Sequence, residues 1–335
     1  MLKLSVLDQS PIPSGGTAAD AIRHTIDLAQ ATEKLGYTRY WVAEHHGSSA
    51  FAGCAPEIML TRIAEATSTI RVGSGGVMLS HYSPYKVAEM FRLLEVMYPG
   101  RIDLGIGRAP GSDGVTAQAL GYGSPVGVEY YPARVADLSA FMAGSSPPTE
   151  AFADVKALPE TEHIPEIWVL GSSDQSAGCA AHFGLPFSFA HFIMPRGGVN
   201  VVKAYKDAFK PSELFDAPRD SVAVFVICAE TEKEASRLEA SRDLFRLRAS
   251  RGDFIPYPTP EEALAYEYSA GELAQVEANR ERNIVGTPRQ VKMRIEELAD
   301  QYDTEEIVVL SICHDHNDRV RSYELVAEAF NLQAN

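Results

Sequence analysis

The sequence predicts an α/β fold of the (β/α)8 TIM-barrel class. Short apolar runs rich in β-branched residues alternate with longer amphipathic stretches, an order typical of a parallel sheet. Eight such runs occur, the number that closes a barrel, and 335 residues are enough to build one. The runs span residues 2–7, 40–43, 70–79, 102–106, 167–170, 187–190, 222–228 and 307–312. An open doubly wound sheet is the alternative arrangement of the same elements.

Helical patterns separate these runs. Residues 18–35 place apolar side chains roughly on one face, which is the period of an amphipathic helix. Residues 56–68 and 84–97 each begin with proline, a residue that suits the first turn of a helix. Thr287 to Gln290 read as a capping box with proline in the first turn. Strand and helix therefore alternate along most of the chain.

Two segments interrupt this alternation, after strands 4 and 7. Residues 108–131, with their continuation to 166, are rich in Gly, Ser and Pro, and residues 248–283 combine a proline-rich turn with a polar helix. In a barrel, loops that follow strands lie on the C-terminal face, where such enzymes carry their chemistry. We therefore interpret both insertions as walls or lids of a site.

Composition limits the partners and the compartment. Apolar residues make up 45% of the chain and charged residues 22%, as in a globular protein with a substantial core. A net charge of −15 disfavours binding to nucleic acid or to an anionic membrane. The N-terminal residues read as a strand and not as a signal peptide. The four cysteines have no metal-type spacing, so we expect a reduced, cytoplasmic protein: Cys54, Cys179, Cys228 and Cys313.

The second strand leads into Glu44, His45 and His46. Because neighbouring side chains on a regular strand point to opposite sides, at most one of the two histidines faces the mouth of the barrel. A carboxylate followed by histidines is able to bind metal, to relay protons or to cap the end of a strand. The residues alone leave these three interpretations open.

Glycines mark the third and fourth strands. Gly73, Gly75 and Gly76 lie within the third strand, where glycine indicates either a bulge, close packing, or the approach of something flat to the backbone. On the fourth strand, Gly107 precedes Arg108, whose guanidinium is able to fork onto a phosphate or to pair with a loop carboxylate. A loop follows this strand instead of a helix, which disfavours a Rossmann dinucleotide site.

The fifth strand ends in a turn suited to an anion. Gly171, Ser172, Ser173 and Gln175 stand at the start of a predicted helix, where free N–H groups, hydroxyls and the helix dipole favour a phosphate. Barrel enzymes more often bind phosphate after strands seven and eight. Here those strand ends lack glycine and carry acidic residues, so the sequence moves the predicted phosphate site to strand five.

Further histidines near strand ends suggest a rival function, a metal-dependent hydrolase. They are His81, His191, His314 and His316. The usual pattern of such hydrolases has a His-x-His on the first strand and an acid on the last, whereas this chain has its His-x-His after the last strand. We therefore expect no metal site.

Taken together, four motifs resemble the bacterial luciferase-like flavin monooxygenases. They are WVAEHH, VGSGGVML, RIDLGIGRAPG and LGSSDQSA, in the order and spacing of that family. The resemblance continues through GLPFSFAHF, VGTP and HDHNDRVRSYEL, so it covers nearly the whole chain. It is closer to single-chain luciferase-like oxidoreductases than to light-emitting subunits, and it implies one domain over residues 1–335.

The resemblance implies an FMN-dependent oxidoreductase. Reduced FMN would bind at the mouth of the barrel as a co-substrate, supplied by a separate NAD(P)H:flavin reductase. With O2 it would oxidise a small organic substrate. Aromatic residues in the insertions suggest that this substrate is apolar or aromatic: Tyr122, Tyr130, Phe254 and Tyr257. A homodimer is a further expectation, and a non-catalytic flavin-binding relative is a further alternative.

The resemblance also assigns roles to residues. His45 matches the family's active-site histidine and would donate or accept a proton, while Glu44 would orient the site. Gly75 and Gly76 match a non-proline cis peptide placed against the flavin ring. Arg108 matches a phosphate-binding position of the family, and so does the turn that follows strand five.

That turn comprises Gly171, Ser172, Ser173 and Gln175. The chain departs from the family at two of these positions, Gly171 and Gln175, and at Gly107 on the fourth strand. Gly107 replaces a reactive cysteine of the luciferase subunit, so nothing here supports light emission. Gly171 replaces an acidic residue, which leaves the backbone to fill that role. Gln175 replaces a hydroxyl side chain, which puts its part in phosphate binding in doubt.

Overall fold

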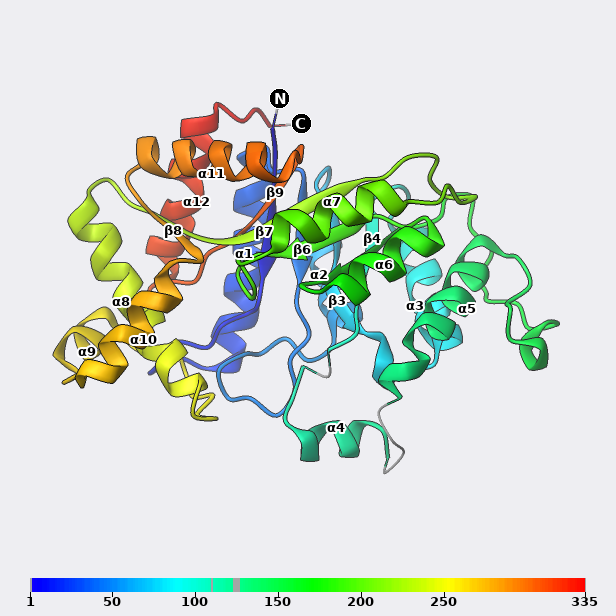
Figure 1. Cartoon of the computed structure of the whole chain (residues 1–335), viewed down its shortest axis with the longest axis horizontal. Helices are drawn as coiled ribbons and strands as arrows, with labels where there is room; N and C mark the ends of the chain where they lie inside the picture. Colours follow the sequence, from blue (N-terminus) through cyan, green and yellow to red (C-terminus); the bar gives the residue numbers. More distant parts are fainter. Residues whose placement is uncertain (1, 110, 123–126, 335) are drawn as a thin grey trace.

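In the computed structural model, which describes residues 2–109, 111–122 and 127–334, parallel strands form a closed ring with helices outside it (Figure 1). The strands are β1 (Lys3–Asp8), β2 (Arg39–Val42), β3 (Arg71–Met78), β4 (Ile102–Gly107), β5 (Glu166–Gly171), β6 (Phe187–Ala190), β7 (Asp220–Cys228), β8 (Asn283–Gly286) and β9 (Glu306–Leu310). Strands β1 to β6 pair in sequence, β6 pairs with β7, and β9 joins β7 to β1. Eight strands thus close the predicted barrel.

The strand β8 is absent from the sequence prediction. It pairs with the last four residues of β7, Phe225–Cys228, whereas β9 pairs with Val222–Phe225, so only Phe225 pairs with both strands. Its sequence, NIVG, is short and only half apolar, and it lies where we expected the end of an insertion. Pairing with β7 selects the extended conformation there, which no local pattern indicates.

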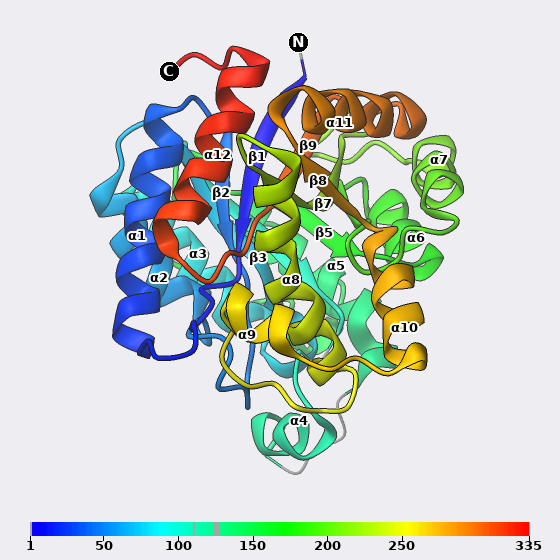
Figure 2. The ribbon, with the colours of Figure 1, turned by 90° about the vertical axis from the view of Figure 1, so that its left-hand side faces the viewer.

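The helices alternate with the strands as the sequence predicts. They are α1 (Ala18–Lys34), α2 (Pro56–Ala66), α3 (Pro84–Met97), α4 (Gly114–Leu120), α5 (Tyr131–Ala143), α6 (Asp174–Phe183), α7 (Gly198–Ala208), α8 (Glu232–Ala249), α9 (Pro260–Ala265), α10 (Ala270–Arg280), α11 (Pro288–Tyr302) and α12 (His316–Phe330). Figure 2 shows α1 and α12 side by side on the outer surface. The predicted capping box at Thr287 is present at the start of α11.

Both predicted insertions are present. After β4 the chain forms α4, which projects from the rest of the fold in Figures 1 and 2, before α5 returns to the barrel. After β7 it forms α8, α9, α10 and β8 before α11. Helices α9 and α10 both pack on α8. No helix in the described part of the chain has the length and hydropathy needed to cross a bilayer.

The N-terminal end of the barrel is filled by a buried ion-pair network. Arg39, the first residue of β2, donates from Nε to Glu306 Oε1 at 2.7 Å and from Nη1 to Asp103 Oδ2 at 2.8 Å. Arg71 also pairs with Asp103, and Glu166 accepts from Arg39 at 3.3 Å. The first residues of several strands are therefore polar. For this reason β5, β7 and β9 begin one or two residues before the apolar runs that predicted them.

Candidate active site

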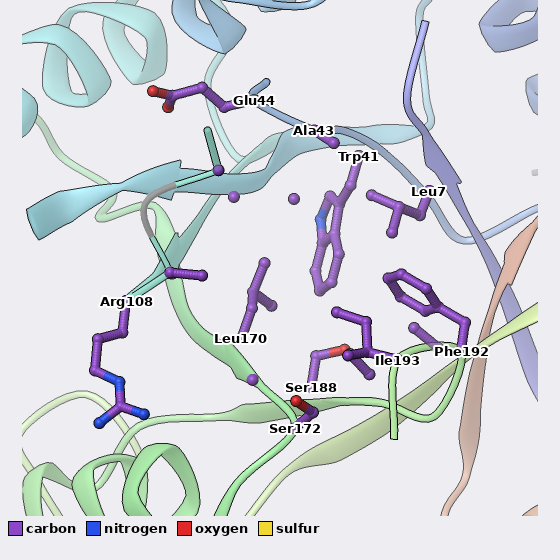
Figure 3. Close-up of a pocket in the computed structure, with 18 of the residues that line it drawn as sticks. Leu7, Trp41, Ala43, Glu44, Arg108, Leu170, Ser172, Ser188, Phe192 and Ile193 are labelled. Atoms are coloured by element: carbon purple, nitrogen blue, oxygen red, sulfur yellow. The ribbon is translucent and has the colours of Figure 1, made fainter. Parts of the chain in front are cut away.

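A cavity of about 390 Å³ opens at the C-terminal end of the barrel (Figure 3). Most of its wall is apolar, with Leu7, Trp41 and Leu170 from the strands and Phe192 and Ile193 from the segment after β6. Trp41 connects the cavity to the network beneath it, because its Nε1 donates to Asp103 Oδ2 at 2.9 Å. The floor of the cavity is thereby fixed to the closed end of the barrel.

Glu44 ties the ends of two strands together. Its carboxylate is buried, and Oε1 accepts hydrogen bonds from the Tyr82 hydroxyl at 2.6 Å and from His46 Nε2 at 2.7 Å. Its Oε2 accepts from the backbone N–H of Met78 at 3.1 Å. Glu44 therefore holds the segment after β2 against the end of β3. It lies at the edge of the cavity and points away from Trp41 in Figure 3.

His45 lines the cavity, and His46 turns to Glu44. Because β2 ends at Val42, both histidines lie beyond the strand, yet only one faces the mouth, as strand alternation would also require. The ring of His45 stacks on Phe51 with centroids 4.5 Å apart. Burial, with His46 nearby, lowers the pKa of His45 to about 4, so the ring is neutral at pH 7. Its Nδ1 is buried without a hydrogen-bond partner among the described residues.

The peptide bond between Gly75 and Gly76 is cis, as the resemblance implies. Both residues line the cavity. A Cβ on Gly75 would lie 2.5 Å from Leu7 Cδ1, and one on Gly76 would lie 2.7 Å from the carbonyl oxygen of Gly105. Close packing therefore requires glycine here, and the same bare backbone is exposed to whatever fills the cavity.

The polar end of the cavity lies between β4 and β5. These strands are neighbours, with Gly107 paired to Leu170, so Arg108 and Gly171 follow at the same rim. Ser172, Ser173 and Ser176 line the cavity with Arg108, and Ser173 caps the N-terminus of α6. Figure 3 shows Arg108 and Ser172 on the same side of the cavity. Hydroxyls, a guanidinium and a helix start together suit a phosphate.

Gln175 is placed differently from the other predicted phosphate-site residues. Its Oε1 accepts a hydrogen bond from Arg108 Nη1, and the residue is absent from the wall of the cavity. Gln175 thus contacts the Arg108 guanidinium from outside the cavity wall. Gly171 lies in the wall, and a Cβ there would overlap Ser176.

The prediction that aromatic residues of the insertions form the apolar wall is wrong. Tyr122 is 97% exposed, Tyr130 and Phe254 are also exposed, and Tyr257 is buried in the core outside the cavity wall. The wall comes instead from Trp41 on β2 and from Phe192, which lies in the quoted GLPFSFAHF segment. The sequence could have indicated Trp41 as a wall residue, because large side chains at inward-facing strand positions fill the barrel interior.

The histidines that suggested a metal site do not converge. His191 Nδ1 lies 3.0 Å from the Tyr302 hydroxyl, His314 Nε2 lies 3.0 Å from Ser14 O, and His316 Nε2 lies 2.7 Å from Asp27 Oδ2. None of these side chains, nor His81, lines the cavity. Within residues 2–109, 111–122 and 127–334, no three His, Cys, Asp or Glu side chains are arranged to hold a metal ion.

The fold and the site together define a β/α-barrel enzyme whose working groups lie at the carboxyl ends of the strands. A family model described as luciferase-like monooxygenase matches residues 2–305. The chain belongs to this family of oxidoreductases.

Similar proteins extend over the full chain. YwcH of Bacillus subtilis (strain 168) is 47% identical over 98% of this chain and 99% of its own length. The N-acetyl-S-alkylcysteine monooxygenase of the same organism is 37% identical over 98% of each chain. The crystal structure of apo-MsnO8 is 40% identical, with a TM-score of 0.92 over 100% of both chains. These matches thus cover the whole chain, its insertions included, and the structural match shows the same fold in MsnO8.

Proposed function

We propose that the protein is a flavin-dependent monooxygenase that binds reduced FMN and uses O2 to oxidise a small organic substrate. The observation that carries this proposal is the layout of one cavity. Apolar walls suit a flat ring, a serine-rich helix start with Arg108 suits a terminal phosphate, and neutral His45 lies on the wall. Membership of the luciferase-like monooxygenase family supports the same assignment.

Each group has a specific task in this proposal. Arg108 and the hydroxyls of Ser172 and Ser173 would hold the phosphate, while Leu7, Trp41 and Leu170 would enclose the ring and exclude water. Reduced flavin, when bound, supplies two electrons to O2, so that one oxygen atom enters the substrate and the other leaves as water. His45 would move a proton at its unpartnered ring nitrogen, since a neutral imidazole is able to accept one.

In this proposal, Glu44 acts by holding neighbouring segments together. Its hydrogen bonds to Met78 N–H and to Tyr82 hold the segment that carries His45. We therefore assign Glu44 a positioning role, and we reserve the catalytic role for His45.

The site supports FMN over a dinucleotide. One compact anion site lies between β4 and β5, and the loop after β4 leads away from the strand instead of starting a helix. We propose that a separate NAD(P)H:flavin reductase supplies the reduced flavin in the cytoplasm and that the protein forms a homodimer of single-domain chains. The Bacillus subtilis relative named for N-acetyl-S-alkylcysteine suggests thioethers of this kind as first substrates to assay.

Flavin titration tests the proposal. The purified protein is titrated with FMN, FAD and riboflavin, each oxidised and reduced, followed by fluorescence and calorimetry. We expect the tightest binding for reduced FMN. Equal affinity for FAD would contradict the assignment of Ser172 and Ser173 to a terminal phosphate. Tight flavin binding without oxidation of any thioether tested would favour the non-catalytic alternative.

A further inference from the structure

The ring of His45 is held by packing and not by hydrogen bonds. Its backbone N–H donates to the carbonyl oxygen of Gly53 at 2.8 Å, but no hydrogen bond joins either ring nitrogen to the part of the chain that the structure describes. A hydrogen bond at one nitrogen usually fixes the orientation of a histidine that handles protons. The contact that takes its place is the stack on Phe51, with ring planes 27° apart.

Phe51 lies behind His45 and outside the cavity. It is absent from the wall that the described residues form, whereas His45 is part of that wall. Its ring packs edge-on against Phe245 of α8, with centroids 5.8 Å apart and an interplanar angle of 77°. Phe245 in turn packs on Tyr257, with centroids 5.0 Å apart, and both of these rings are buried. His45 thus ends a row of four rings that runs from the mouth into the insertion after β7.

Backbone contacts fix this row in place. Phe51 pairs with Pro11 in an antiparallel bridge, and Ile12 N–H donates to the carbonyl oxygen of Ala50 at 2.8 Å. The N–H of Tyr257 donates to the carbonyl oxygen of Ile12, also at 2.8 Å. The segments after β1, β2 and β7 are thereby joined through their backbones. A shift of Phe51 would disturb these contacts, so its ring gives His45 a fixed surface to pack on.

A flat ring suits an imidazole that must keep one orientation. Aromatic rings in contact prefer offset-stacked or edge-on arrangements, so the stack resists tilting of the His45 plane. An aliphatic side chain at position 51 would fill similar space without a flat face that selects one plane. Orientation matters here because a small misplacement of a group that transfers a proton lowers the rate strongly.

We propose that Phe51 is a positioning residue for His45: its ring, supported by Phe245, holds the imidazole in one orientation at the cavity wall. This inference rests on the proposed function, which gives His45 the proton transfer. It extends that function to a residue outside the cavity and gives a purpose to the contact between the site and the insertion after β7.

NMR of the full-length protein tests the inference. Histidine labelled with 13C is observed, and His45→Gln identifies the His45 ring signals by their absence. Relaxation dispersion measures exchange of the ring between orientations on the μs–ms timescale. We expect little exchange in the wild type and several-fold more in Phe51→Leu, because the flat face is lost. Phe51→Tyr keeps the ring and should resemble the wild type, and Phe245→Leu, which removes the support, should be intermediate.

A matched control lies at the opposite end of the barrel. Phe209 is also half-buried and packs edge-on against a ring, with its centroid 5.8 Å from that of Tyr205. It directly follows α7, and the helices of such a barrel end at the N-terminal face of the strands. Phe209→Leu should leave the His45 signals unchanged.

Thermal unfolding checks that each variant is folded, and Phe245→Leu decides if Phe51→Leu does not fold. Unchanged exchange of the His45 ring in these two variants would overturn the inference. Equal effects of Phe51→Leu and Phe209→Leu would overturn it as well, because the change would then reflect a general loss of packing.

Turnover separates this inference from the proposed function. With N-acetyl-S-methylcysteine, a thioether of the class that one Bacillus subtilis relative is named for, Phe51→Leu should lower kcat by about ten- to a hundredfold. KM and FMN affinity should stay nearly unchanged, and Phe51→Tyr should restore most of the rate. An unchanged kcat despite a mobile His45 ring would contradict the inference. If the wild type bound no flavin or oxidised no thioether, the proposed function would fail, and the NMR comparison would still decide whether Phe51 fixes His45.

Discussion

At the N-terminal end of the barrel, the Arg39 guanidinium lies between Asp103 and Glu306 and is bonded to both. At the C-terminal end, the His45 ring is partly exposed, and its buried Nδ1 has no partner among the described residues. Both ends bury polar groups within the same ring of strands. The Arg39 guanidinium is fully paired, whereas the unpaired nitrogen of His45 belongs to a residue of the cavity wall.

This difference separates stability from function within one scaffold. A satisfied network at the closed end holds the strand starts in register, because removal of any member leaves a buried charge uncompensated. Unsatisfied groups at the mouth cost stability and remain available to a ligand. Substitutions at the two ends should therefore affect different measurements.

The largest effect is expected at His45. Replacing it with alanine should reduce substrate oxidation by about 10²–10⁴, the usual size of general acid–base contributions, because the proton acceptor is lost. Affinity for FMN should change little, and release of hydrogen peroxide should rise. Steady-state oxygen consumption with product analysis measures both. Unchanged turnover would move the role from His45 to another group.

The next largest effect is expected at the closed end. Arg39→Met removes the arginine that pairs with Glu306 and one of the two that pair with Asp103, and it should cost about 3–5 kcal/mol of unfolding free energy. Urea denaturation measures the loss. Arg23→Met, which removes an exposed arginine from α1, serves as the control and should have little effect. If Arg39→Met had normal stability but lost affinity for FMN, the closed end would contribute to binding as well, and the distinction between the two ends would fail.

Arg108→Ala tests the phosphate site at the mouth. It should weaken FMN binding by about 1.5–3 kcal/mol, the typical contribution of a hydrogen bond to a charged group, and should leave riboflavin binding almost unchanged. Lysine should restore only part of the affinity, because a point charge cannot form two parallel bonds. Equal losses for FMN and riboflavin would mean that Arg108 acts on the ring or on the fold.

Two glycines on β4 sharpen the comparison within a single strand. A Cβ on Gly105 would overlap the backbone oxygen of Ser74, whereas one on Gly107, at the mouth, meets nothing within 4 Å. Gly105→Ala should therefore lower stability by about 1–3 kcal/mol, the usual cost of overpacking. Gly107→Ala should stay within about 0.5 kcal/mol. Thermal denaturation of the two variants measures these losses of stability. Equal losses would contradict the difference in packing.

The last effect concerns the pH dependence of stability and is absent at pH 7. The folded pKa of His45 is about 4, below the 6.5 of the unfolded chain, so the unfolded state binds its proton first as the pH falls. The free energy of unfolding should therefore fall as the pH is lowered from 6.5 to about 4, by at most about 1.4 kcal/mol per pH unit. His45→Gln should flatten this slope in urea titrations. An unchanged slope would assign the pH dependence to other groups.

Local pattern alone predicted much of the molecule. The alternation of apolar runs and helices predicted eight barrel strands and both insertions, because burial on both faces and helical amphipathicity leave periods that are visible in the sequence. The positions of Arg108 and Ser173 at neighbouring strand ends also followed, since strand order in a parallel barrel is the order of the chain. Residue motifs supplied the family.

Contacts between distant segments decided the rest. The strand β8 forms because β7 offers it a partner, and Gln175 turns to Arg108 because the two strand ends meet. Arg242 lies on α8 and Asn283 begins β8, 41 positions apart in the chain, and nothing in either segment indicates that their side chains meet. Proximity of this kind depends on how helices pack over the mouth, and local sequence carries no record of it.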